Sequence, residues 1–321
     1  LSGGVATEKA YFEDWAGDPT LFFESDGDLM AVASFLDEVD LDGKSLFVAA
    51  PHYRHPTIAF LSDEYENIRW LPGSSALVFP PEEPAIIIFP HNSPAPTWAI
   101  DYLKFGERID TGNRNTADAV FEAYEIPALS SLPVKKRVDT NFGNIITLLD
   151  YDTSSTNAGN ELPVTLFWRV NNIPAFNYMP FLQLEDAWGH RWSQQETFSY
   201  PSEQWVVGDT IIQQAAVPVP LGAPPGTYRV RVGLFDPATG DRISLLDQNG
   251  GYAGDSYFIE DVEIEAGSLP ESFPTPPFNL DKQIIPGLRL MGFGRGASTT
   301  PAGGPWGLSF TASAYIVGLF R

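Results

Sequence analysis

The sequence has no cysteine among its 321 residues and only 4 histidines. Without cysteine the chain has no disulfides, no thiolate nucleophile and no sulfur ligands for zinc, a composition that fits an extracytoplasmic bacterial protein. No stretch reaches the roughly 20 apolar residues that a membrane-spanning helix needs. The nearest candidate, 305–320, is uncharged, but its alternation of apolar and polar residues favours a strand.

Positive charge is also scarce, because 19 Lys and Arg residues stand against 41 Asp and Glu, for a net charge of −22. This balance argues against nucleic-acid binding, which needs a basic face, and against adsorption to anionic lipid headgroups. Apolar residues make up 43% of the chain, enough for well-packed cores. The length and composition therefore predict a globular protein of two or three domains.

The most informative pattern lies in 226–235, GTYRVRVGLF. Tyr228, Val230, Val232 and Leu234 alternate with polar residues, which is the period of a half-buried strand. Pro224, Pro225 and Gly226 precede this run, and the turn-forming sequence DPATGD follows it. We therefore predict an antiparallel β-sandwich strand with those four side chains inside.

Similar runs recur along the middle of the chain. We predict eight strands, near 145–151, 162–170, 178–185, 191–198, 211–217, 227–235, 242–246 and 256–264. The tail repeats part of this pattern, since LRLMGF at 288–293 matches ITLLDY at 146–151. We interpret the tail as the start of a second sandwich copy.

The N-terminal third alternates helical and strand-like segments. Helices are expected over 7–16 and over 55–61. A further helix is expected to begin at Asp26, with Leu29, Val32, Ala33 and Leu36 on one side. Short apolar strands are expected at 46–49, 76–79 and 85–89. This order predicts a small, largely parallel sheet covered by helices.

The predicted fold class is therefore α+β multidomain. Residues 1–110 form a small α/β domain, and 111–137 form a polar linker ending in a basic run. Residues 138–266 form an antiparallel immunoglobulin-like β-sandwich. Residues 267–280 form a proline-rich linker, and 281–321 form a partial sandwich repeat or strands added to the first sandwich.

Aromatic residues supply the candidate binding site. Trp188, Trp192, Tyr200 and Trp205 fall within 18 residues near predicted turns. Exposed aromatic rings stack on the apolar faces of sugars, so these four are candidate carbohydrate contacts. The alternative interpretation is core packing, because large aromatic side chains dominate sandwich cores.

No catalytic residue is assigned, because no nucleophile–base pair is recognisable in the sequence. No cofactor is predicted apart from a calcium ion. Asp236 and Asp241 could bind it with side-chain and backbone oxygens of the turn between them. The alternative is that both are ordinary turn formers.

Several motifs together resemble a known bacterial arrangement. These are YFEDWA, SLFVAAPHYRHPTIAFL and WLPGSSALVFPPEEPAIIIFP in the N-terminal part, and SYPSEQW, PPGTYRVRVGLFDPATGDR and LLDYDTSSTNAGNELPVTLFWRV in the sandwich. Over residues 5–265 the chain resembles the soluble region that follows the membrane helices of large Chloroflexi-type glycosyltransferases. Those enzymes are similar to dolichyl-phosphate-mannose protein mannosyltransferases and lipid A aminoarabinose transferases.

The resemblance implies a non-catalytic extracytoplasmic region in the cell envelope. Its partners would be a glycan or glycoprotein acceptor and the upstream membrane region of the same protein, with no nucleic acid. Catalysis in that family uses membrane-embedded residues, so no catalytic position carries over to this sequence. The alternative is a free-standing secreted or cell-surface module that binds carbohydrate or builds structure. Because the chain starts at Leu1, we expect either processing or a longer parent protein.

Overall fold

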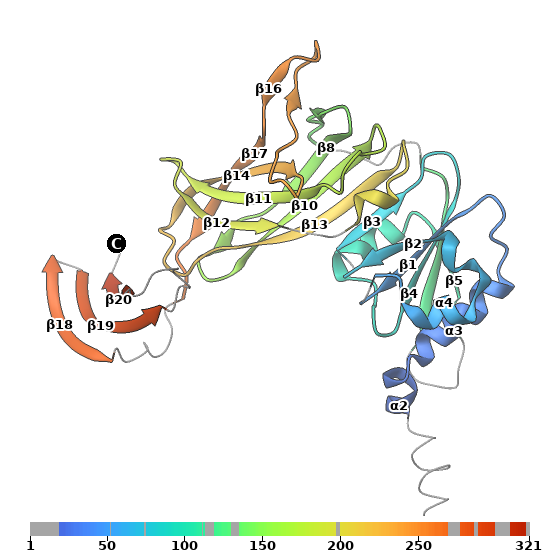
Figure 1. Ribbon diagram of the computed structural model, residues 1–321, viewed down its shortest axis with the longest axis horizontal. Coiled ribbons are helices and arrows are strands. Elements are labelled where there is room, and N and C mark those ends of the chain that lie inside the picture. Colours follow the sequence, from blue (N-terminus) through green and yellow to red (C-terminus); the bar gives the residue numbers. More distant parts are fainter. Residues whose placement is uncertain are drawn as a thin grey trace, which may run out of the picture.

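The structure is a computed structural model that describes residues 19–51, 53–73, 75–110, 112, 119–129, 135–196, 200–268, 277–285, 288–298 and 309–318. The described chain is mostly β-sheet. Figure 1 shows a mixed sheet with helices at one end, a two-sheet sandwich in the middle and a three-stranded sheet at the other end. The predicted helix over 7–16 lies outside the described residues.

The mixed sheet has the strand order β2-β1-β4-β6-β5. Strands β2, β1 and β4 are parallel, whereas β6 and β5 run antiparallel to their neighbours. The strands are β1 (Ser45–Ala50), β2 (Ile68–Pro72), β4 (Ala85–Pro90), β5 (Glu107–Asp110) and β6 (Phe121–Ile126). The helices of this unit are α2 (Pro19–Glu24), α3 (Gly27–Glu38), α4 (Pro56–Leu61), α5 (Ile100–Leu103) and the 3-10 turns η2 (Asp63–Asn67) and η3 (Thr97–Ala99).

Strand β1 shows why strands of this sheet are apolar along their whole length. Leu46 and Val48 pack in a cluster with the buried side of α3, formed by residues such as Val32. Phe47 and Ala49 point to the other face, into the large core that continues through the sandwich. Both faces of the sheet are covered, so both sets of side chains are apolar.

The sandwich consists of two sheets with the strand orders β16-β15-β7-β8-β10-β13-β3 and β12-β11-β14-β17-β9. The strands of the first sheet are β3 (Ala76–Phe79), β7 (Thr140–Phe142), β8 (Ile146–Thr153), β10 (Glu161–Val170), β13 (Thr210–Pro218), β15 (Leu245–Leu246) and β16 (Tyr252–Gly254). The second sheet contains β9 (Thr156–Asn157), β11 (Met179–Asp186), β12 (Arg191–Glu196), β14 (Gly226–Phe235) and β17 (Tyr257–Glu265). The 3-10 turn η4 (Ser202–Gln204) lies before β13.

The predicted register of β14 is confirmed. Tyr228, Val230, Val232 and Leu234 are at most 2% exposed and face the other sheet, whereas Arg229 lies on the solvent side. The Tyr228 hydroxyl donates a 2.7 Å hydrogen bond to the Pro224 carbonyl, which satisfies its polar tip while the ring stays in the core.

Two strands, β3 and β6, contradict the predicted division into domains. Strand β3 was expected in the N-terminal sheet, but it pairs with β13 of the sandwich over four residue pairs, from Ala76 to Phe79. Strand β6 occupies residues 121–126, within the expected linker, and pairs with β4 and β5. Its apolar residues Phe121, Ala123 and Ile126 are buried, so this segment is part of a core.

A fourth sheet follows the sandwich, with β19 (Leu288–Ser298) between β18 (Phe278–Ile285) and β20 (Ser309–Gly318). Most of the predicted proline-rich linker, 269–276, lies outside the described residues. The matched segments 146–151 and 288–293 lie on β8 and β19, each the middle strand of an antiparallel three-strand run. The internal repeat stays a prediction.

In the part of the chain that the structure describes, no helix combines the length and apolarity needed to cross a membrane.

Candidate functional site

The hairpin between β11 and β12 presents the most exposed tryptophan of the described chain. The Trp188 side chain is 90% exposed. The turn beneath it is held by Asp186, whose Oδ1 accepts the backbone N–H groups of Trp188 at 3.0 Å and His190 at 2.9 Å. The Asp186 backbone N–H also donates to the His190 carbonyl at 3.0 Å. A largely exposed ring therefore stands on a turn with a fixed backbone.

Trp192 anchors the same hairpin from below. Its indole Nε1 donates to Asp186 Oδ2 at 3.0 Å, and its ring lies edge-on to Tyr228 of the core with 6.4 Å between centroids. The hydrogen bond from Trp192, reinforced by the backbone N–H groups, lowers the pKa of the Asp186 carboxyl below its usual range. Trp192 is half-buried, and the His190 ring lies against it at 5.4 Å.

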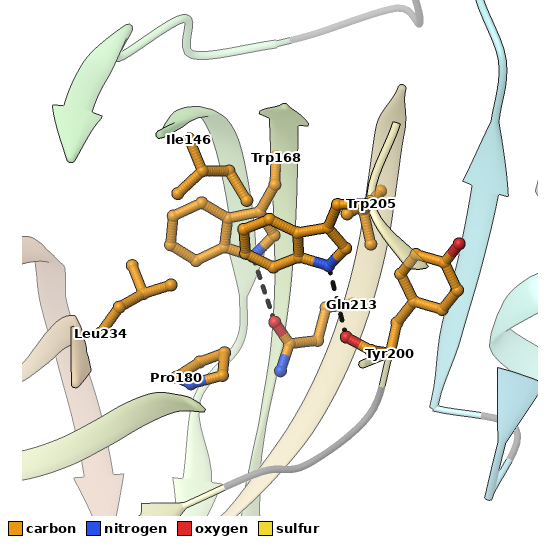
Figure 2. Close-up of a pocket in the computed structure, with 8 residues that line it drawn as sticks. Ile146, Trp168, Pro180, Tyr200, Trp205, Gln213 and Leu234 are labelled. Carbon is orange, nitrogen blue, oxygen red and sulfur yellow. Dashed lines mark hydrogen bonds between the residues drawn. The ribbon is translucent and has the colours of Figure 1, made fainter. Parts of the chain in front are cut away.

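Tyr200 and Trp205 lie elsewhere, next to the mixed sheet. They are only 6% and 7% exposed, so the expectation that they stack on a sugar is corrected for this pair. Both residues line an internal cavity of about 10 Å³. Figure 2 shows this cavity, whose other lining residues are Ile146, Trp168, Pro180, Ile211, Gln213 and Leu234. A cavity of that size has room for a single water molecule, not for a sugar.

The Trp205 indole donates to the Tyr200 carbonyl at 3.4 Å, and Trp168 donates to Gln213 Oε1 at 3.1 Å. These polar tips are satisfied inside the protein, as expected for aromatic side chains of a core. The four aromatics that lie close in sequence therefore separate in space. The exposed Trp188 and the half-buried Trp192 share the hairpin, whereas Tyr200 and Trp205 form a buried pair.

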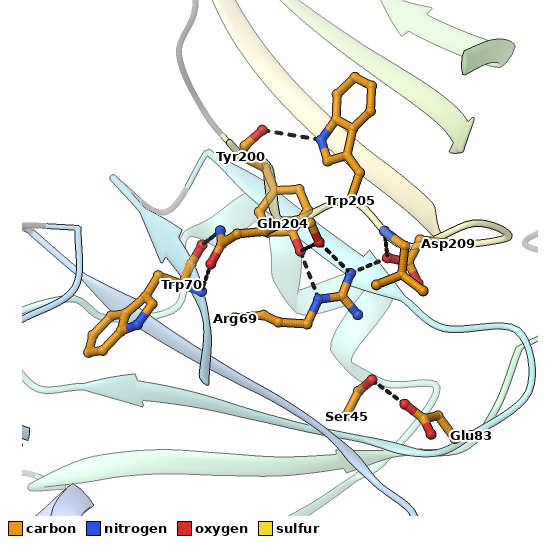
Figure 3. A network of polar contacts seen from close by, with 9 residues as sticks. Ser45, Arg69, Trp70, Glu83, Tyr200, Gln204, Trp205 and Asp209 are labelled. Carbon is orange, nitrogen blue, oxygen red and sulfur yellow. Dashed lines mark hydrogen bonds and ion pairs between the residues drawn. The ribbon is translucent and has the colours of Figure 1, made fainter. Parts of the chain in front are cut away.

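Tyr200 of the buried pair belongs to a polar cluster that we call the junction network, formed by Arg69, Tyr200, Gln204 and Asp209 (Figure 3). Arg69 of β2 forms an ion pair with Asp209, and its Nε donates to the Tyr200 hydroxyl at 2.9 Å. Its Nη2 also donates to the Gln204 carbonyl at 3.2 Å. The guanidinium lies 4.6 Å from the centre of the Phe47 ring. The network thus joins the mixed sheet to the sandwich.

Gln204 extends this junction along the edge of β2. Its Oε1 accepts the Trp70 backbone N–H at 2.6 Å, and its Nε2 donates to the Trp70 carbonyl at 2.9 Å. The Gln204 side-chain amide therefore forms with the Trp70 backbone the two hydrogen bonds that a neighbouring strand would form. Burial raises the pKa of the Tyr200 phenol above its usual range, so the hydroxyl stays protonated as a donor and acceptor. Burial also raises the pKa of Asp209, and Arg69 opposes that shift.

In the predicted calcium-binding turn, the Asp236 carboxylate and backbone N–H form hydrogen bonds with other residues of the turn. Asp236 is 8% exposed, and its Oδ1 accepts the Ala238 N–H at 2.8 Å while its Oδ2 accepts the Thr239 hydroxyl at 3.4 Å. The Asp236 N–H donates to the Asp241 carbonyl at 2.8 Å. This geometry supports the turn-forming interpretation of Asp236 and Asp241. Across the described residues, no group of three or more His, Asp or Glu side chains is placed to hold a metal ion.

The sequence did not indicate the junction network. Residues 69 and 209 are 140 positions apart, and a single arginine on a short strand carries no signal of its partner. The only local sign is Gly208-Asp209 immediately before β13, a pattern that any strand-initiating turn shares.

No protein-family model matches the chain, and no curated protein matches it. The CARDB domain of the PF1109 protein from Pyrococcus furiosus aligns with 36% of this chain and 90% of its own length, at 10% identity and a TM-score of 0.22. A family 123 glycoside hydrolase from Clostridium perfringens aligns with 42% of this chain and 27% of its own, at 12% identity and a TM-score of 0.23. Likeness at this level carries no argument about function.

Proposed function

We propose that this chain is a non-catalytic binding region that contacts glycan through the β11–β12 hairpin. The observation that supports the proposal is the 90% exposed ring of Trp188, held on a turn that Asp186 fixes with two hydrogen bonds. A tryptophan face left in water has apolar area to cover, and the apolar face of a sugar ring covers it while the sugar hydroxyls stay solvated.

The hairpin is suited to this task because it needs little ordering on binding. The turn is closed by Asp186, and the Trp192 indole ties it to the sandwich. Preorganisation of this kind reduces the entropy lost when a ligand binds. A single exposed ring still contacts few atoms, so we expect dissociation constants on the order of 0.1–1 mM.

We further propose that the chain is the extracytoplasmic region of a membrane glycosyltransferase, where it positions a glycan or glycoprotein acceptor. The resemblance of the sequence motifs to those of such enzymes supports this setting. In this proposal the mixed sheet and its helices are the small α/β domain. The sandwich is immunoglobulin-like, with Tyr228 bonded to the Pro224 carbonyl and Trp168 buried between its sheets.

A glycan array followed by calorimetric titration tests the binding proposal. Trp188→Ala should weaken binding to an array hit at least tenfold and leave the melting temperature within about 1 °C, because an exposed side chain supports no core. Phe60→Ala is the matched control, since Phe60 on α4 is 88% exposed and belongs to the mixed-sheet unit. Equal affinity of the Trp188→Ala variant and the parent would refute the proposal.

The transferase setting is tested separately, by reading the DNA upstream of the codon for Leu1. Coding sequence for about ten hydrophobic spans supports it. A cleavable leader directly upstream would instead favour a free-standing secreted module.

A further inference from the structure

We infer that the hairpin takes a sugar that carries a carboxylate, such as a uronic acid, with Arg191 as the group that selects it. This inference rests on the proposed glycan binding and names its ligand class. Arg191 is the first residue of β12 and is exposed on the outer face of its sheet.

Arg191 differs from the other arginines of this face in having no carboxylate partner. The face carries a row of paired positions, Arg191 opposite Glu185 and Glu185 opposite Arg229. Glu185 is engaged by Arg231, which donates from Nε at 2.9 Å and from Nη2 at 3.0 Å. Arg229 lies 3.8 Å from Asp261. Within the described residues, Arg191 forms no ion pair and donates only to the neutral Gln194 Oε1, at 2.8 Å.

The carboxylates at and beside the paired position of Arg191 are already engaged by other donors. The Glu185 side chain is 12% exposed and bidentately paired with Arg231. Both carboxylate oxygens of Asp186 accept N–H groups of the hairpin, three in total. Among the described residues, the Arg191 guanidinium is therefore an exposed cation without an ion-pair partner, on a protein whose net charge is −22. Its planar donors match the two oxygens of a carboxylate.

Distance makes a joint contact feasible. Trp188 and Arg191 are three residues apart, so their Cα atoms lie within about 11 Å of each other. A sugar stacked on the Trp188 ring can present its own carboxylate, or that of the next sugar, to Arg191. A neutral glycan would use the ring alone.

The test uses pairs of oligosaccharides that differ only in charge. Tetrasaccharides of galacturonic, glucuronic and mannuronic acid are each titrated beside their fully methyl-esterified forms. At least one acid should bind about fivefold tighter than its ester, the size of one exposed charge-assisted pair. Raising the salt from 20 to 300 mM should remove most of that preference, because exposed charges are screened. Arg191→Met should abolish the preference without changing the affinity for the ester.

Arg108→Met is the matched control, since Arg108 is an exposed arginine of β5 on the other unit. It should leave both affinities unchanged. If acid and ester bind the parent equally, or if Arg191→Met keeps the preference, the acidic-sugar inference is wrong while glycan binding through Trp188 stands. If no oligosaccharide of either kind binds, the acidic-sugar inference is wrong, and the glycan array decides the binding proposal separately.

Discussion

Removal of the Asp209 carboxylate should destabilise the whole described fold, because it leaves Arg69 unpaired at the junction of the two units. The Asp209 side chain is 1% exposed and that of Arg69 is 15% exposed, so water compensates little of the lost interaction. Truncation of one member of a buried ion pair costs about 3–5 kcal/mol. Arg69 keeps its hydrogen bonds to Tyr200 and to the Gln204 carbonyl, so we expect Asp209→Ala to lie at the lower end, about 3 kcal/mol.

Urea unfolding followed by circular dichroism measures this effect. With a denaturant dependence of about 3 kcal/mol per molar urea, a loss of about 3 kcal/mol moves the midpoint down by about 1 M. Asp261→Ala is the control, because Asp261 pairs with Arg229 at an exposed site and should contribute no more than about 1 kcal/mol.

A compensated variant separates loss of the ion pair from loss of packing. In Arg69→Met with Asp209→Leu, no unpaired charge remains, and apolar replacement of a buried pair is often neutral or stabilising. At least half of the lost stability should return. A midpoint for Asp209→Ala no lower than that of Asp261→Ala would refute the argument that the junction network couples the two units.

Three further predictions concern the core. Val230→Asp should lower the free energy of unfolding by more than 3 kcal/mol, because Val230 is fully buried, whereas Thr227→Ala on the same strand should stay within about 1 kcal/mol in the same urea assay. Burial raises the pKa of Tyr151 to about 12, so the folded state keeps a proton that the unfolded state releases near pH 10. The free energy of unfolding should therefore fall as the pH rises from about 10 to 12, and Tyr151→Phe should flatten that fall. Gln213 Nε2 is buried without a hydrogen-bond partner among the described residues, so a high-resolution crystal structure should show a water bound to it in the adjoining cavity; an empty cavity would contradict this.

The sandwich could be predicted from sequence because its strands repeat a simple local pattern. Strands β8, β10, β11, β13, β14 and β17 lie within about two residues of their expected bounds. In β14 and β17, most residues alternate between a face on the opposite sheet and a face toward water. A period of two in hydrophobicity follows directly from that environment, as the burial of Val230 beside the exposed Arg229 shows.

The placement of strands in sheets was harder to predict. Ala76–Phe79 is apolar on both faces, and such a run fits any doubly covered sheet. Its true partner, β13, lies more than 130 residues further along the chain. The polar surroundings of β6 likewise concealed its buried residues Phe121 and Ala123 within an expected linker.

The candidate site was predicted in part. Clustering of aromatics in sequence drew attention to Trp188 and Trp192, which the hairpin brings together. The same criterion included Tyr200 and Trp205, since sequence alone does not distinguish an exposed ring from a core ring. Arg191 could not be singled out from the sequence. Its paired residue Glu185 is engaged by Arg231 of another strand, and that pairing is visible only in the fold.

The most direct test of glycan binding at the hairpin follows the indole N–H signals of the 8 tryptophans by ¹H–¹⁵N NMR during titration with an array-selected glycan. Binding at the hairpin should give saturable shifts for Trp188 and smaller ones for Trp192, with Trp168 and Trp205 unchanged because they are buried. A glycan that binds without shifting the Trp188 signal, or that shifts only tryptophans of other elements, would contradict it.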